Sequence, residues 1–324
     1  MMLPKSAIIA VTLNCNLRCL MCNIWKNKIK DELKPHEYSK LPTSLREINI
    51  TGGEPFLRDD IDEVIKYIKK ACKSARIVIS TNGYLSDKIE SKMRGILNID
   101  SKVALRISID GPERLHNKIR GVNDAFQNAF ETLIRVKKAG VRDIGIAMTI
   151  SNLNAEKIYE VFKISREINT QFTISVTSSS DIYFGLIDDK IKKLDLNQFD
   201  DKIKLIAKER MNTFSIKEWA RAWFEDSLLK YVKTGKRSFR CNAAEGFFYM
   251  DSQGNVHGCH IIDSYIENIN NYNNFEKLWN SGRRELIVKL SRNCNKCWMV
   301  CTSKSQINKR KFLIALSILK KKFL

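Results

Sequence analysis

Six short runs of apolar, largely β-branched residues recur along the first 180 residues of the chain. They are near-continuously apolar rather than strictly alternating, a pattern typical of parallel strands buried on both faces. We predict strands at Ala7–Leu13, Glu47–Thr51, Arg76–Thr81, Val103–Ile109, Asp143–Thr149 and Phe172–Thr177. Helical spacing separates them, notably at 59–73, 126–140 and 154–169. In the first of these helices Cys72 falls on the apolar stripe, so we interpret it as a core thiol.

The alternation of strands and helices predicts an α/β fold with a parallel sheet and helical crossovers. Polar or cysteine residues follow every predicted strand. In a (β/α) barrel the active site is built at this carboxyl end of the strands. Turn formation alone also favours Gly, Asn, Asp and Ser, but six successive occurrences favour a site.

The pattern changes after residue 180. Helices rich in both charge signs extend to about residue 240. The segments Phe247–Tyr249 and Val256–Cys259 then predict a β-hairpin that turns near Gly254, and a helix is expected at 274–290. We therefore divide the chain into a barrel (1–180), a helical segment that links or covers it (181–240), a small hairpin and helix domain (241–305) and a basic amphipathic tail (306–324).

The charge balance is the unusual bulk property. The formal net charge is +20, although 44% hydrophobic and 28% charged residues are ordinary for a globular protein. The charge permits an anionic partner, but Lys is spread over nearly every predicted helix, and a solvated surface explains it as well. No segment approaches the ~18 apolar residues of a membrane span. We expect a cytoplasmic protein, whose tail either packs on the barrel or lies on an anionic membrane surface.

The nine cysteines form two groups, with Cys72 apart. An odd count at tight spacing favours metal ligation over disulfides, and hence a reducing compartment. The spacing Cys15-x3-Cys19-x2-Cys22 suits a four-iron cluster in which three thiolates leave one iron open. Structural zinc is the alternative, but it requires a closed set of four ligands, and no fourth lies nearby in the sequence.

Three motifs together resemble the radical S-adenosylmethionine (SAM) superfamily. They are CNLRCLMC (Cys15 to Cys22), GGEP (Gly52 to Pro55) and SIDG (Ser108 to Gly111). The resemblance covers residues 5–180 and implies a partial (β/α)6 TIM-type barrel. It further implies a [4Fe–4S] cluster on Cys15, Cys19 and Cys22, with SAM bound to the open iron.

The resemblance also implies roles for the residues at the strand ends. In the GGEP motif, Glu54 and the backbone of Gly52 and Gly53 would hold the SAM ammonium. Ser108 or Asp110 would bond the ribose, with Asn82 as a further candidate, and Arg120 would meet the carboxylate. Met21 departs from the family, in which this position is usually aromatic and stacks on the adenine.

The C-terminal cysteines resemble a shortened SPASM domain of the form called twitch, which implies a second, auxiliary [4Fe–4S] cluster. The matching pattern is Cys241-x12-Gly254-x4-Cys259 followed by Cys294-x2-Cys297-x3-Cys301. Five cysteines exceed the four that one cluster needs. We favour the first four as ligands, with Cys301 free or a substitute. A zinc ribbon and unliganded thiols are alternatives, and His257 or His260 could replace a cysteine.

We therefore expect an enzyme that cleaves SAM to a 5′-deoxyadenosyl radical and abstracts hydrogen from a peptide, sugar or lipid-linked substrate. An electron donor such as ferredoxin or flavodoxin would supply the reducing electron. The rival hypothesis is a non-enzymatic zinc protein that binds nucleic acid. No aromatic and basic RNA-recognition motif supports it, so no specific nucleic acid is expected.

Overall fold

The computed structural model describes residues 3–27, 32–310, 312, 314–316, 318 and 319. All six predicted strands are confirmed, and each of their ends lies within one residue of the predicted position. The strands are β1 (Ser6–Thr12), β2 (Glu47–Gly52), β3 (Arg76–Thr81), β4 (Ala104–Ser108), β5 (Ile144–Ile150) and β6 (Gln171–Val176). Neighbours in this order pair in parallel.

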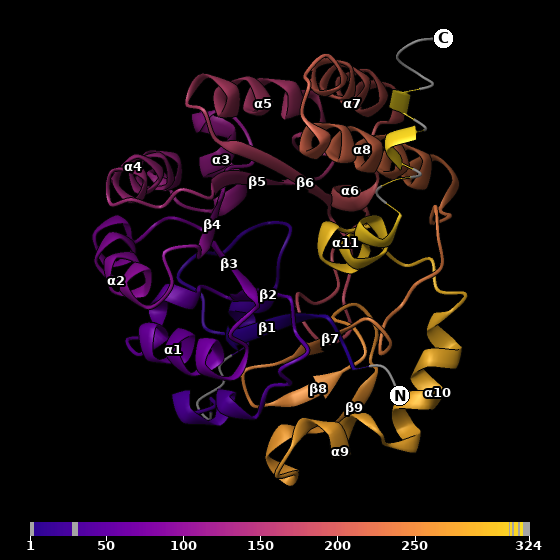
Figure 1. The fold of residues 1–324 in the computed structure, drawn as a ribbon. Helices are drawn as coiled ribbons and strands as arrows, with labels where there is room; N and C mark the ends of the chain where they lie inside the picture. Colours follow the sequence, from indigo (N-terminus) through magenta and orange to yellow (C-terminus); the bar gives the residue numbers. More distant parts are fainter. Residues whose placement is uncertain (1–2, 28–31, 311, 313, 317, 320–324) are drawn as a thin grey trace.

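Helices cover the outer side of this sheet (Figure 1). The crossovers contain α1 (Ile61–Ala71), α2 (Ser86–Ile99), α3 (Glu113–Arg120), α4 (Ala125–Lys138) and α5 (Ile158–Glu167). The apolar stripe of α1 packs into the main core, and Cys72 at its end is fully buried, with its Sγ 3.3 Å from the carbonyl oxygen of Pro42. Cys72 is therefore a core thiol, as predicted.

The inner face of the sheet differs from the prediction of strands buried on both faces. Outward positions such as Ile48 and Ile50 are buried and apolar, but the alternate positions Asn49 and Thr51 line a cavity. In β6 polar and apolar residues also alternate, and Phe172 and Ile174 are buried, although residues of both kinds border the cavity. Because successive side chains of a strand point to opposite faces, a polar inner face must repeat every second residue. The barrel interior is therefore a cavity with polar as well as apolar lining side chains, rather than a packed apolar core.

Three further strands extend the sheet beyond β1. Strand β7 (Phe247–Met250) pairs in parallel with β1, and β8 (Asn255–His257) and β9 (Tyr265–Asn268) follow in antiparallel pairing. The order is β6-β5-β4-β3-β2-β1-β7-β8-β9, so the barrel is not closed. The predicted hairpin is present, but it shares the sheet of the barrel, and β9 was not anticipated.

The chain between residues 181 and 240 forms α6 (Asp189–Lys192), α7 (Leu196–Met211) and α8 (Ile216–Thr234). The prediction of one helix at 274–290 is wrong. The segment is divided into α9 (Phe275–Trp279) and α10 (Gly282–Ser291). The Ser281 side chain accepts a hydrogen bond from the Arg284 backbone and so begins a new helix.

Helix α11 (Val300–Lys309) lies against the open side of the barrel, where Lys304 bonds to Glu47 at the start of β2. Within the tail, Ile314 and Ile318 are buried in the main core, whereas Phe312 is 75% exposed. The basic residues 320–322 lie outside the described part. None of the helices described is both long and apolar enough to cross a membrane.

Candidate active site

The three N-terminal cysteines occupy the loop after β1, and all three line one cavity of about 910 Å³. Burial is the main cause that raises the pKa of Cys15 to about 11 and that of Cys22 to about 12. Neighbouring thiols contribute to both shifts, Cys19 to that of Cys15 and both other cysteines to that of Cys22. Thiolates at these positions therefore need a cation to stabilise them. A bound iron cluster provides that positive charge.

Gly52 and Gly53 are required by the backbone that carries the cysteine loop. A Cβ atom on Gly52 would lie 2.1 Å from the carbonyl oxygen of Thr12, and one on Gly53 would lie 2.1 Å from that of Asn14. Gly52 also has a positive φ of 145°, which other residues rarely adopt. The glycines thus let the end of β2 approach the start of the cysteine loop, and both still line the cavity.

Glu54 differs from the role implied by the family resemblance. Its side chain is fully buried and is not among those lining the cavity. Its carboxylate accepts hydrogen bonds from the Asn82 backbone (2.7 Å), the Thr81 hydroxyl (2.8 Å) and the Phe56 backbone (3.1 Å). Glu54 therefore joins the end of β2 to the end of β3. Pro55 begins the short 3-10 helix that Glu54 caps, where a missing N–H costs nothing.

Asp110 is also turned away from the cavity. One carboxylate oxygen accepts from the Thr149 backbone at 2.9 Å, and the other contacts Arg120 at 2.6 Å. Asp110 is fully buried. These contacts bind β4 to β5 and to α3, so the geometry does not support direct bonding of a ribose by the Asp110 carboxylate.

Arg120 reaches the cavity and meets the cysteine loop. Its Nη1 lies 3.7 Å from Cys19 Sγ, while its other nitrogens hold Asp110. The Arg120 charge lowers the pKa of the Cys19 thiol, against a larger rise caused by burial. The sequence suggested Arg120 as a ligand for the SAM carboxylate. Its contact with Cys19 was not foreseen.

Asn82 and Ser108 both line the cavity, as expected for residues that could contact SAM. The Asn82 side chain donates to Asn16 Oδ1 at 2.8 Å and accepts from the Tyr84 backbone at 2.9 Å. Asn82 therefore also fixes the cysteine loop, which contains Asn16.

Sequence reasoning assigned no contact with SAM to several residues of the cavity wall that carry unpaired polar atoms. Thr177 Oγ1, Ser178 Oγ and His260 Nδ1 are buried and have no hydrogen-bond partner within the described part of the chain, and all three residues line the cavity. Buried polar atoms are normally paired, so these atoms fit a polar ligand. The signal available in the sequence was the position of Thr177 and Ser178 directly after β6.

All five C-terminal cysteines belong to or border one hydrophobic cluster, and the mutual pKa influences are among four of them. Burial is the main cause that raises the pKa of Cys241, Cys259 and Cys297. Neighbouring thiols raise these pKa values too: Cys259 and Cys294 act on Cys241, Cys294 acts on Cys259, and Cys241 and Cys259 act on Cys297. Arg237 Nη1 lies 3.5 Å from Cys297 Sγ, a second arginine–thiol contact. These four residues are the ligands that the sequence favoured.

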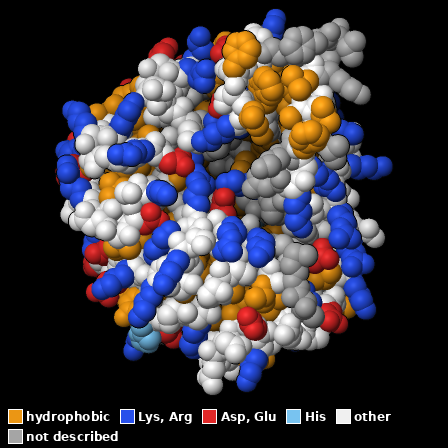
Figure 2. Space-filling model, in the orientation of Figure 1, with side chains coloured by type: hydrophobic (Ala, Val, Ile, Leu, Met, Phe, Trp, Pro, Cys, Tyr) orange, Lys and Arg blue, Asp and Glu red, His pale blue; other side chains and the backbone are white. Residues whose placement is uncertain are grey.

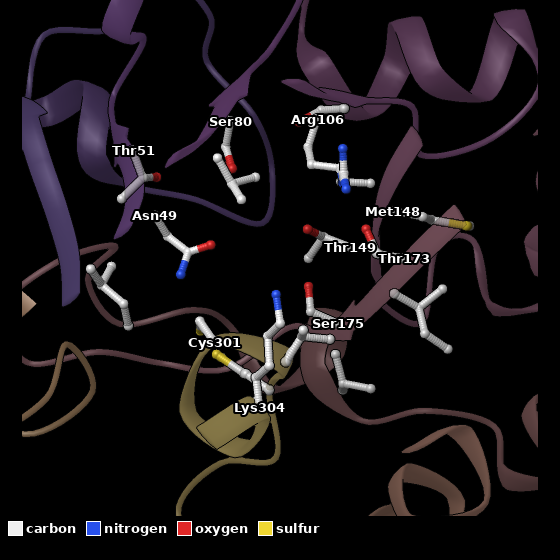
Figure 3. Close-up of a pocket in the computed structure, with 18 of the residues that line it drawn as sticks. Asn49, Thr51, Ser80, Arg106, Met148, Thr149, Thr173, Ser175, Cys301 and Lys304 are labelled. Atoms are coloured by element: carbon white, nitrogen blue, oxygen red, sulfur yellow. The ribbon is translucent and has the colours of Figure 1, made fainter. Parts of the chain in front are cut away.

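Cys301 instead lines the large cavity beside Lys304 (Figure 3). Burial raises its pKa to about 12, and the charges that act on it are those of Arg237 and Glu47. His257 is buried near Asp263, and His260 Nε2 lies 3.4 Å from Met299 Sδ. Among the residues described, no three Cys, His or carboxylate side chains converge closely enough to hold a single metal ion.

An open parallel barrel with three cysteines after its first strand defines an iron–sulfur enzyme of the (β/α) barrel class. Residues 9–163 match the family model described as Radical SAM superfamily, so this part of the chain belongs to that superfamily. Its cofactors are a [4Fe–4S] cluster and SAM.

Two curated relatives illustrate the range of the superfamily. The chain is 30% identical over 164 residues to an Fe-coproporphyrin III synthase of Methanosarcina barkeri. This match covers 48% of this chain and 40% of the relative. It is 29% identical over 211 residues to a probable GTP 3′,8-cyclase of Methanococcus aeolicus. This match covers 61% of this chain and 66% of the relative. The chain thus spans less than two thirds of the length of either relative.

A solved structure resembles the whole fold. "Native anSMEcpe with bound AdoMet and Cp18Cys peptide" superposes with a TM-score of 0.67 and 20% identity, and the match covers 98% of both chains. The likeness includes the C-terminal strands and helices as well as the barrel, and at this identity it concerns the fold alone.

Proposed function

We propose that this chain cleaves SAM reductively in the barrel cavity and abstracts hydrogen from a substrate held beside it. The observation that carries the proposal is that Cys15, Cys19 and Cys22 line the same cavity as Gly53, Ser108 and Arg120. When bound, the cluster supplies the electron that breaks the carbon–sulfur bond of SAM and releases a 5′-deoxyadenosyl radical.

The residues of the chain orient SAM and exclude water. Gly52 and Gly53 present backbone groups to the ammonium at the end of β2. Arg120 offers a cation to the carboxylate, and Ser108, Thr177 and Ser178 offer hydroxyls to the ribose or the adenine. Glu54 and Asp110 act indirectly, since their hydrogen bonds hold the strand ends that carry these groups.

A second cluster in the region 241–305 completes the proposal, with Cys241, Cys259, Cys294 and Cys297 as ligands. Both cysteine groups border one hydrophobic cluster, which contains Tyr183, Tyr249 and Ile261. This arrangement suits electron transfer between the clusters or contact of the second with substrate. Ferredoxin or flavodoxin is the proposed external donor.

We place a peptide first among the substrates, ahead of a sugar or a lipid-linked molecule. The support is the peptide bound to the solved structure of similar fold. Residues 1–180 would then supply the radical, 181–240 would cover the cavity, 241–305 would hold the second cluster, and 306–324 would be a surface tail.

The test is anaerobic reconstitution. The protein should be brown and contain roughly eight irons, as two four-iron clusters require. With dithionite it should convert SAM to 5′-deoxyadenosine, and a Cys15→Ala, Cys19→Ala and Cys22→Ala variant should not, while it retains roughly half of the iron. Colourless protein that holds only zinc would contradict the proposal.

A further inference from the structure

The end of the cavity away from the cysteine loop is lined with charged side chains. Glu47 and Arg76 are register partners at the starts of β2 and β3, and Asp143 directly precedes β5. Because parallel strands begin at the same edge of a sheet, these groups meet at the amino end of the barrel. Arg106 reaches this end from β4 and bonds to Asp143 at 2.8 Å.

Two helices from the C-terminal half add cations to the same space. Lys217 and Arg221 come from α8, and Lys304 comes from α11. Figure 3 shows the Lys304 amine directed into the cavity, opposite Arg106 and near Asn49. In the space-filling view Lys and Arg side chains lie at the rim of the hollow on this face, together with some Asp or Glu (Figure 2).

The carboxylates here are too few to balance the cations. Asp143 is shared by Arg76 (2.6 Å) and Arg106 (2.8 Å), and Glu47 pairs with Lys304 and, at 3.6 Å, with Arg76. Three cations therefore share two carboxylates.

The cations from α8 add to this excess. Arg221 pairs with Glu218, but Glu218 is also bonded by Arg210. Glu225, the remaining carboxylate of the lining at this end, is taken by Arg210 at 2.9 Å. Lys217 contributes a further positive charge.

We infer that this cationic end binds an anionic group, a phosphate or a carboxylate, of the substrate on which the proposed radical chemistry acts. Guanidinium groups match such anions with paired hydrogen bonds. Burial is the main cause that lowers the pKa of Lys304 and Lys217. The charges of Arg76 and Arg106 lower both pKa values further, while Glu47 opposes the shift of Lys304 and Asp143 that of Lys217. The inference rests on the proposed function.

One cavity contains both ends, so an anion held here would orient the rest of the substrate toward the cysteine loop. Between the ends, Thr149, Thr173 and Ser175 present hydroxyls to the cavity (Figure 3). These hydroxyls can hydrogen-bond a polar substrate body, such as a peptide backbone or a sugar, while neighbouring lining residues such as Met148 and Phe172 contact its apolar parts.

The test uses the full-length holoprotein with SAM bound and no reductant. Phenyl phosphate, benzoate and the neutral analogue benzyl alcohol are titrated by calorimetry, so that the first two distinguish phosphate from carboxylate. One or both anions should bind at a single site, and the alcohol should not. Arg221→Gln and Lys304→Gln should each weaken anion binding about tenfold, as the loss of one charge-assisted hydrogen bond predicts.

Lys230→Gln is the matched control, because Lys230 is exposed on the same helix as Arg221 and does not line the cavity. It should leave anion affinity unchanged, and SAM binding in each variant verifies the fold. Equal binding of benzyl alcohol, dissociation constants above about 10 mM for both anions, or unchanged affinity in both cavity variants would overturn the inference. None of these readouts requires SAM cleavage, so failure here is distinct from failure of the proposed function.

Discussion

Arg120 and Cys19 are joined across the cavity wall, with 3.7 Å between Nη1 and Sγ. The same guanidinium holds Asp110, which is fully buried and anchored to the backbone of β5. A strand end, a helix and the cysteine loop thus meet at one arginine. The contact transmits the position of the barrel strands to the loop that would hold the cluster.

The Arg120–Asp110 pair gives a stability prediction. Arg120→Gln leaves the Asp110 charge buried and unpaired, so the free energy of unfolding should fall by about 3 kcal/mol. Adding Asp110→Asn removes the isolated charge and should recover part of that loss. Urea denaturation of the anaerobic holoprotein measures both effects. A single variant as stable as the wild type would show that the pair contributes nothing.

Glu54 gives a prediction about pH. Burial is the largest influence on the Glu54 carboxyl and raises its pKa from 4.5 to about 7. The unfolded chain ionises near pH 4.5 and the folded protein near pH 7, so the folded state binds more protons between these values. Stability therefore falls as pH rises through this window, by up to about 3 kcal/mol from this group.

Glu54→Gln cannot ionise, so its melting temperature should decline less than that of the wild type between pH 5.5 and 8. Glu225, whose pKa burial also raises to about 7, is present in both proteins and cancels in the comparison. Glu63→Gln, an exposed site on α1, is the control. Parallel melting curves for Glu54→Gln and wild type would refute the assignment.

The strands could be predicted because each combines β-branched residues with a polar turn at its end, and this signal is local. The hydrogen-bond partners of Glu54 and Asp110 could not be predicted from the sequence. They come from β3, β5 and α3, and no spacing in the sequence shows which way a side chain beyond the end of a strand turns.

The polar interior did leave a signal. In β6 the order Gln171-Phe172-Thr173-Ile174-Ser175-Val176 alternates strictly, and the polar members Gln171, Thr173 and Ser175 line the cavity. This alternation was overlooked because the strands were interpreted as near-continuously apolar. The pairing of β7 with β1 had no local signal, because it joins segments some 240 residues apart.

The auxiliary ligands can be identified by subtraction. In a background where Cys15, Cys19 and Cys22 are already Ala, each C-terminal cysteine is replaced singly by Ala and the remaining iron is counted by Mössbauer spectroscopy. Loss of Cys241, Cys259, Cys294 or Cys297 should lower cluster content. Cys301→Ala should leave it unchanged, because Cys301 lies on the cavity side beside Lys304. If Cys301→Ala empties the site and Cys297→Ala does not, the ligand set is wrong.

The tail gives the last prediction. Its buried residues Ile314 and Ile318 pack against the body, while Phe312, Leu316 and Leu319 are 75%, 44% and 36% exposed. Lysine and arginine flank this apolar stretch in the sequence. Apolar side chains beside basic residues suit an anionic membrane surface, where each Lys or Arg contributes about 1 kcal/mol.

We therefore expect full-length protein to float with phosphatidylglycerol vesicles, and less so with neutral phosphatidylcholine vesicles. A triple variant with Phe312, Leu316 and Leu319 changed to Ser should remain in the soluble fraction with both. Changing the exposed leucines Leu186, Leu286 and Leu290 to Ser is the control, since it removes similar apolar surface elsewhere. The variant changed at Phe312, Leu316 and Leu319 keeps the buried Ile314 and Ile318. It therefore tests the exposed side of the tail and leaves the core intact. The tail would be excluded as a membrane contact if both triple variants floated alike. It would also be excluded if the wild-type protein floated with neither type of vesicle.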